Sequence, residues 1–150
     1  MVPVFGIWPP IKPKLLRRVH DRLTGLGGCE TVRYEPSKRD PHEVVAEFDP
    51  STFLGRDYSA EEAKLRAEFD LSGDRPHYWI QWWEPGQNRS IGWHADDTEP
   101  KLGPVHIQIE YPDGTIRRDS AENVEDEHPY RSFERRLAEL PEKIDEFGWE

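Results

Sequence analysis

The chain is poor in cysteine, in lysine and in long apolar runs. Its 150 residues contain one cysteine, Cys29, which excludes an internal disulfide framework and a zinc site built from several cysteines. No stretch approaches the ~20 apolar residues that a membrane helix needs. The N-terminus lacks the basic start and long apolar run of a signal peptide. We therefore expect one domain over residues 1–150, in the cytoplasm and without a membrane segment.

The apolar content is also low. Hydrophobic residues make up 35% of the chain, and the mean hydropathy is -0.90. Aromatic residues nevertheless make up 11%, including six tryptophans, whereas a disordered chain has few aromatics. We expect a folded core in which large aromatic side chains supply much of the buried apolar area.

Charge is distributed unevenly along the chain. The net charge is -10, and six lysines stand against fourteen arginines. Residues 1–39 hold eight Lys/Arg and three Asp/Glu (+5), and residues 40–150 hold twelve and 27 (-15). An acidic, lysine-poor surface fits a high-salt cytosol. The basic N-terminal segment fits a nucleic acid or an acidic partner, or alternatively a solvated helix face; its charges are Lys12, Lys14, Arg17, Arg18 and Arg22.

Two helices are predicted, one near each end of the chain. Prolines stiffen residues 1–13 into an extended arm. A three- and four-residue apolar spacing then predicts a helix over 13–26, ended by glycines. A second helix is expected from Pro129, which suits a first helical turn, and Pro141 should end or kink it. Its expected apolar face comprises Phe133, Leu137, Leu140 and Ile144.

Alternating patterns predict strands between these helices. Residues 59–62 resemble a capping box and predict a short helical turn. Residues 77–84 carry apolar groups on both faces, which indicates a central strand. The chain as a whole predicts an α+β fold, an antiparallel sheet meander of about five or six strands with the two helices packed on it. The expected strands cover residues 30–34, 43–49, 65–71, 77–84, 89–94, 105–111 and 115–119.

The chemistry-bearing residues concentrate around His94 and His106. These histidines stand at the end of one predicted strand and the start of another, so paired strands would bring them to the same end of the sheet. Gly92 is expected to leave room beside His94 for a ligand. Asp96 follows closely, and a carboxylate near a histidine fixes its tautomer and raises its basicity.

One chemistry that fits this set is metal-independent RNA cleavage. It needs a base for the 2′-hydroxyl, an acid for the leaving oxygen and a cation for the phosphate. His94 and His106 are the candidates for the first two roles, with Asp96 as their carboxylate. The cation would be Arg89, or Arg117 with Arg118, and Trp93 would stack a base.

Two other interpretations of the same residues remain open. His94, Asp96 and His106, with His77 as a fourth candidate, could supply mixed nitrogen and oxygen ligands to a metal, although their spacing matches no standard motif. The histidines could instead be sheet-surface residues that donate to Asp96, Asp97 or Glu110. We expect no metal and no cofactor.

A family resemblance bears on this choice. The segments 92–97 (GWHADD) and 102–108 (LGPVHIQ) resemble a group of small haloarchaeal proteins of unassigned function. More distantly, residues 76–145 are similar to the TumE-type toxins of toxin–antitoxin pairs. Trp93, His94, Asp96 and His106 match that family's motif by position, whereas its histidine-rich run is represented here by His106 alone.

The resemblance implies an RNA-cleaving toxin neutralised by an antitoxin. We therefore expect a toxin-like protein, an endoribonuclease that uses His94 and His106, with RNA and a cognate antitoxin as partners. The alternative is a non-catalytic interaction module that binds a protein or a nucleic acid through its charged surfaces, or a second copy of itself in a homodimer.

Overall fold

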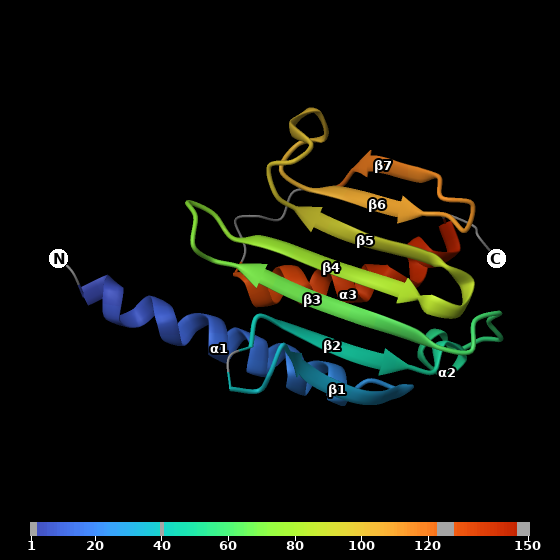
Figure 1. Ribbon diagram of the computed structural model, residues 1–150, viewed down its shortest axis with the longest axis horizontal. Helices are drawn as coiled ribbons and strands as arrows, with labels where there is room; N and C mark the ends of the chain where they lie inside the picture. Colours follow the sequence, from blue (N-terminus) through green and yellow to red (C-terminus); the bar gives the residue numbers. More distant parts are fainter. Residues whose placement is uncertain (1–2, 40, 123–127, 147–150) are drawn as a thin grey trace.

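The computed structural model describes residues 3–39, 41–122 and 128–146. It confirms the α+β prediction: helix α1 (Pro3–Thr24), an antiparallel sheet and helix α3 (Pro129–Glu146) follow one another (Figure 1). Seven strands form the sheet, in the order β1 to β7. They are β1 (Cys29–Glu35), β2 (Glu43–Phe48), β3 (Ala63–Asp70), β4 (His77–Glu84), β5 (Arg89–Ala95), β6 (His106–Glu110) and β7 (Ile116–Ser120).

Every strand pairs with its neighbours in sequence, so the sheet is an uninterrupted meander. Each of the predicted strand segments takes part, which makes seven strands rather than five or six. The two-faced segment 77–84 is β4, the middle strand, as its pattern predicted. As a central strand, β4 has a paired strand along each edge, and it carries apolar side chains on both of its faces.

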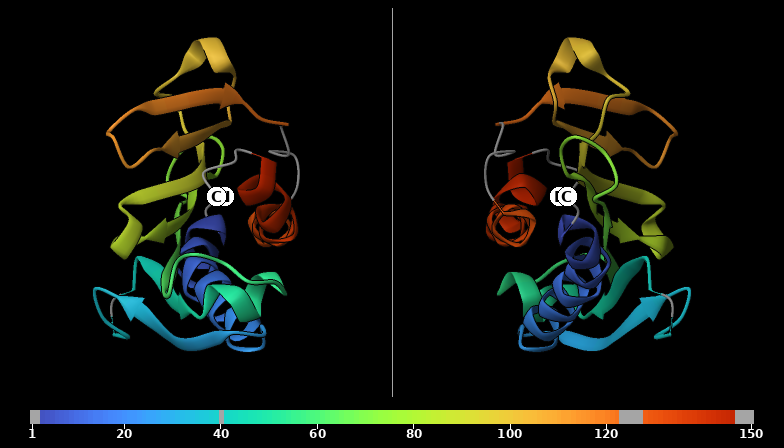
Figure 2. Two further views of the ribbon diagram at one scale, coloured as in Figure 1. Left: turned by 90° about the vertical axis from the view of Figure 1, so that its right-hand side faces the viewer. Right: turned by 90° about the vertical axis from the view of Figure 1, so that its left-hand side faces the viewer.

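Both long helices cover the same face of the sheet (Figure 2). Alternate residues of each strand face them, as in β3, where Leu65 and Phe69 are buried and Arg66 is exposed. Leu16 and Val19 of α1 and Phe133 and Leu140 of α3 complete the core. The opposite face, called the open face below, carries none of the helices in the described part of the chain. No helix in the described ranges is long and apolar enough to cross a membrane.

The N-terminal prediction was wrong over residues 3–13. Instead of an extended arm, the chain is helical from Pro3 onward. Proline fixes φ near -65°, a helical value, and each proline removes only its own donor from the ladder. Leu15, Leu16, Val19 and Leu23 are buried as expected, so the predicted apolar face is right and only the helix start is misplaced.

One further local prediction was wrong, and of the two outcomes expected at Pro141, an end or a kink, the end of the helix does not occur. Residues 59–62 form bends, and the short helix α2 lies earlier, at Pro50–Leu54. Its signals are Asp49 at the cap position and proline at the first turn. Helix α3 continues through Pro141 to Glu146, with Leu140 and Ile144 buried on either side of the proline. Core packing therefore outweighs the lost hydrogen bond there. The acidic segment 121–128, whose composition predicts a loop between the last strand and α3, lies mostly outside the described residues.

Candidate functional site

A row of polar and aromatic side chains crosses the open face. Trp79 of β4 pairs with His94 of β5, His94 pairs with His106 of β6, and His106 pairs with Ser120 of β7. Directly opposed residues point to the same face of an antiparallel sheet. The predicted pairing of the two histidine-bearing strands is therefore confirmed, and both imidazoles lie on the open face.

The two imidazole rings are close neighbours. Their centroids lie 5.0 Å apart with a 57° angle between the planes. The Nε2 atoms of His94 and His106 are buried, and neither forms a hydrogen bond within the described structure. His106 is only 1% exposed, and His94 is half-buried. A buried polar atom without a partner costs about 1–3 kcal/mol, so a ligand that reached either nitrogen would supply a hydrogen bond that the described residues do not.

The surroundings of His94 favour its neutral form. Burial lowers the pKa of His94, and a positive charge on His106 would lower it further. The carboxylates of Asp96 and Glu110 act in the opposite direction but do not prevail. His94 is thus suited to accept a proton near neutral pH.

Asp96 forms its hydrogen bonds with groups other than the histidines. Its Oδ2 accepts the indole N–H of Trp79 at 2.8 Å, and its Oδ1 accepts the hydroxyl and the backbone N–H of Thr98 at 2.6 and 3.0 Å. Burial alone would raise the pKa of Asp96, but these hydrogen bonds outweigh it and hold the pKa below its ordinary value. Asp96 therefore fixes Trp79 and acts on His94 only through its charge.

Gly92 does not provide the expected room for a ligand. A Cβ atom there would lie 2.4 Å from the carbonyl oxygen of Ile80 and 2.7 Å from Cα of Gln81. The backbone of β4 thus occupies the space that a side chain would need. Glycine at this position permits the close approach of β4 and β5.

Two residues predicted to bind substrate lie on the helix-facing side of the sheet. Trp93 is 1% exposed, and the guanidinium of Arg136 lies 5.6 Å from its ring centroid. Arg89 is 5% exposed and forms a buried ion pair with Glu84 at 2.5 Å. The prediction that Trp93 and Arg89 bind substrate beside the histidines was therefore wrong. Along β5, both residues lie on the face opposite His94.

The two arginines of β7 are divided in the same way. Arg118 pairs with Gln108 on the open face and donates to its Oε1 at 3.0 Å. Its positive charge acts on His94. Arg117 pairs with Ile109 on the other face and forms an ion pair with Asp119 at 2.9 Å. Of the predicted cations, the structure brings only Arg118 to the histidine pair.

His77 also lies on the open face but does not join the pair. Its Nε2 lies 3.6 Å from Oδ2 of Asp97. The other oxygen of Asp97, Oδ1, pairs with Arg75. No group of three or more His, Cys, Asp or Glu side chains in the described residues is arranged to hold a metal ion.

Several residues of the open face were not predicted to belong to a site. A hollow of about 280 Å³ lies beside the histidine row, and Trp83 at its edge is 42% exposed. Period-two alternation places Trp79, Gln81 and Trp83 on one face of β4, which was the signal available in the sequence. The lining residues of the hollow are Val45, Lys64, Arg66, Gln81, Trp83, Ser90 and Glu110.

Comparison of the chain with protein-family models, with curated proteins and with solved structures gave no match.

Proposed function

We propose that the protein is a metal-independent endoribonuclease of the toxin type, with His94 and His106 as its acid–base pair. The observation that carries the proposal is the pair itself: two adjacent imidazoles on the sheet face opposite the two long helices, each with a buried Nε2 that has no hydrogen-bond partner in the described structure. Ribonucleolytic transesterification needs two such proton-transfer groups on opposite sides of one phosphate.

The proposed reaction begins at His94, the more exposed member of the pair. Neutral Nε2 of His94 takes the proton from a ribose 2′-hydroxyl, and O2′ attacks the adjacent phosphorus. The bond from phosphorus to O5′ breaks, leaving a 2′,3′-cyclic phosphate on one product. Protonated His106 gives its proton to the departing O5′, and the other product carries a 5′-hydroxyl. Protons, atoms and electron pairs balance without a metal.

The structure sets a condition on both proton transfers. Nε2 of His94 and Nε2 of His106 are buried in the free protein, so the groups around them must move aside when RNA binds. Catalytic hydrogen bonds commonly form only in the substrate complex. Arg118, on the same face, is placed to neutralise the phosphate.

The test is cleavage of single-stranded RNA by the purified protein in EDTA. We expect cleavage by the wild type, with cyclic-phosphate ends, and a rate loss of about 10²–10⁴ in His94→Ala or His106→Ala, the usual contribution of one acid or base. His77→Gln, on the same face but outside the pair, is the matched control. Expression of the wild type should arrest growth, and the double His94→Ala, His106→Ala variant should not. Equal cleavage by wild type and double variant would refute the proposal.

The second candidate is a non-catalytic interaction module. It is favoured by the partial exposure of the open face, where Trp83 stands beside the charged side chains of Lys64 and Arg66. The basic residues of α1 offer another surface. Because α1 buries Leu16 and Val19, that surface is tested by substitution rather than truncation. Lys14→Glu with Arg17→Glu should weaken partner binding, and His94→Ala should leave it unchanged, if the protein is a module.

A further inference from the structure

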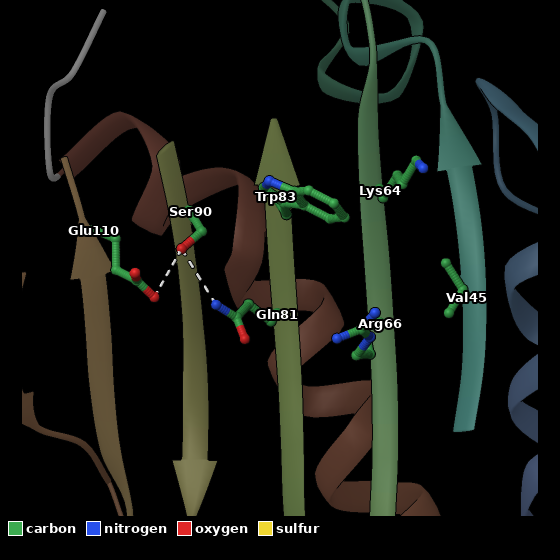
Figure 3. Close-up of a pocket in the computed structure, with 7 residues that line it drawn as sticks. All are labelled: Val45, Lys64, Arg66, Gln81, Trp83, Ser90 and Glu110. Atoms are coloured by element: carbon green, nitrogen blue, oxygen red, sulfur yellow. Dashed lines mark hydrogen bonds between the residues drawn. The ribbon is translucent and has the colours of Figure 1, made fainter. Parts of the chain in front are cut away.

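The hollow on the open face contains a prepared set of hydrogen-bonding groups (Figure 3). Gln81 donates its Nε2 to Ser90 Oγ at 3.2 Å, and Ser90 donates its hydroxyl to Oε2 of Glu110 at 3.3 Å. Gln108 also donates to Oε2 of Glu110, at 3.4 Å. Three strands thereby hold one carboxylate in a fixed orientation above the sheet.

These contacts leave acceptor capacity unused. The hydrogen bonds to Glu110 end at its Oε2 and are long, at 3.3 and 3.4 Å. A carboxylate offers about four lone-pair sites, so Oε1 can accept one donor of a ligand, and a second donor can replace one of the long contacts at Oε2. The wall of the hollow nearest to β5 and β6 is therefore rich in acceptors.

The other side of the hollow supplies a ring and a cation. Trp83 projects from β4 and is 42% exposed, a large value for a tryptophan on a sheet. Nζ of Lys64 lies 5.4 Å from the centroid of its ring. An exposed aromatic side chain is a stacking surface for an unpaired base, and a lysine ammonium can donate to the O6 and N7 atoms of guanine.

We infer that this hollow binds a guanine base of the RNA, an inference that rests on the proposed function and deepens it. Guanine presents two adjacent donors, N1–H and the N2 amino group, and a carboxylate can accept both. Adenine and cytosine present one amino group beside an acceptor, and uracil presents one N–H between two carbonyls. Glu110 therefore recognises the Watson–Crick edge of guanine, Trp83 stacks on the ring, and Lys64 donates to O6.

The hollow is at a suitable distance from the histidines. Glu110 and His106 lie four residues apart on β6, which is about 13 Å at 3.3 Å per residue. Ser90 and His94 are separated in the same way on β5. A base held between Trp83 and Glu110 places its own phosphate, or the next one, near the imidazole pair.

The inference is tested by calorimetric titration of the full-length protein with the 3′-monophosphates of guanosine, adenosine, cytidine and uridine. We expect the guanosine nucleotide to bind roughly 5- to 150-fold more tightly than the others, the range for one bidentate base contact. Glu110→Gln should abolish this preference with the fold intact. Trp83→Leu should weaken the binding of all four nucleotides to a similar extent. The control is Glu47→Gln, which removes a carboxylate of β2 that does not line the hollow and should leave all four affinities unchanged.

The outcomes separate the inference from the proposed function. Equal affinity for the four nucleotides, no binding of any of them, or a guanosine preference that survives Glu110→Gln would each overturn the guanine site. Cleavage of RNA by the wild type without regard to base would leave the ribonuclease proposal intact. Binding of the guanosine nucleotide without RNA cleavage would retain the guanine site and refute the catalytic function.

Discussion

The indole N–H of Trp79 donates to Oδ2 of Asp96 across 2.8 Å, and this hydrogen bond decides the role of the carboxylate. Trp79 lies directly opposite His94 in the sheet. Asp96 thus holds in place a ring that adjoins the histidine pair, while its remaining oxygen is occupied by Thr98. Asp96 was predicted to act directly on the histidines, but in the structure it orients Trp79, which lies next to them.

Replacement of Asp96 by asparagine should lower the free energy of unfolding by an amount that depends on pH. The hydrogen bonds lower the pKa of Asp96 in the folded protein, so the folded state favours the ionised form. The resulting stability is fully present above the unfolded pKa of about 3.9 and is lost as the pH falls through the folded value. We expect Asp96→Asn to cost about 1–3 kcal/mol at neutral pH and less at pH 3, in urea unfolding. The prediction would be contradicted if the difference in free energy of unfolding between wild type and Asp96→Asn were the same at pH 3 and pH 7.

His94 should produce a loss of stability in the same direction, with falling pH, but in the mildly acidic range. Its pKa in the folded protein is lowered by burial, so the unfolded chain binds a proton more readily. Stability from this group is complete above the unfolded pKa of about 6.5 and is lost as the pH falls below it toward the folded value. Thermal unfolding between pH 5 and 8 should show this loss in the wild type and a smaller one in His94→Gln. An NMR titration of His94 with a midpoint above 6.5 would refute it.

The buried ion pair of Glu84 and Arg89 should dominate the stability of the β4–β5 hairpin end. Glu84 is fully buried and also accepts the indole N–H of Trp82 at 2.7 Å. Glu84→Gln leaves the guanidinium of Arg89 buried without its counter-charge, and breaking such a pair costs about 3–5 kcal/mol.

The control for this prediction is the half-exposed pair of Arg33 and Glu35 on β1. Glu35→Gln should cost at most about 1 kcal/mol, as for surface ion pairs. Both variants are measured by urea unfolding at pH 7. A loss in Glu84→Gln no larger than that in Glu35→Gln would show that the buried pair contributes little.

Gly92→Ala should destabilise the sheet. The new Cβ would lie 2.4 Å from the carbonyl oxygen of Ile80, and a backbone atom of a neighbouring strand cannot move away as a flexible side chain can. We expect a loss of about 1–3 kcal/mol, typical of overpacking. Gly86→Ala is the matched control, because nothing lies within 4 Å of its Cβ position. Equal stabilities of the two variants in urea would disprove the close-approach explanation.

Much of the fold could be predicted from local patterns. Strand alternation in 65–71 and the apolar face of the C-terminal helix both lead to buried residues, among them Phe69 and Leu137. The failures involve proline. Residues 3–13 and Pro141 were expected to resist helix formation, yet both lie in helices. Proline weakens a helix locally, whereas packing of residues on either side of Pro141 is a tertiary effect.

The candidate site was less predictable than the fold. The pairing of His94 with His106 followed from their positions on consecutive strands. The face of each neighbour on the same strand also follows from alternation: Glu110 shares the face of His106, and Trp93 lies on the face opposite His94. Trp93 and Arg89 were nevertheless assigned to the substrate, although alternation puts both on the side of the sheet that faces away from His94.

The sequence by itself determined the α+β class, the meander and the two adjacent histidines, since each depends on the period of local apolar patterns and on chain order. Only the tertiary structure decided which polar groups surround those histidines, because hydrogen-bond partners such as Trp79 for Asp96, and Ser90 for Glu110, come from different strands. Among the residues that the structure describes, it also leaves both Nε2 atoms without a hydrogen-bond partner. Burial and cross-strand contacts set that environment, and neither is encoded at any single position.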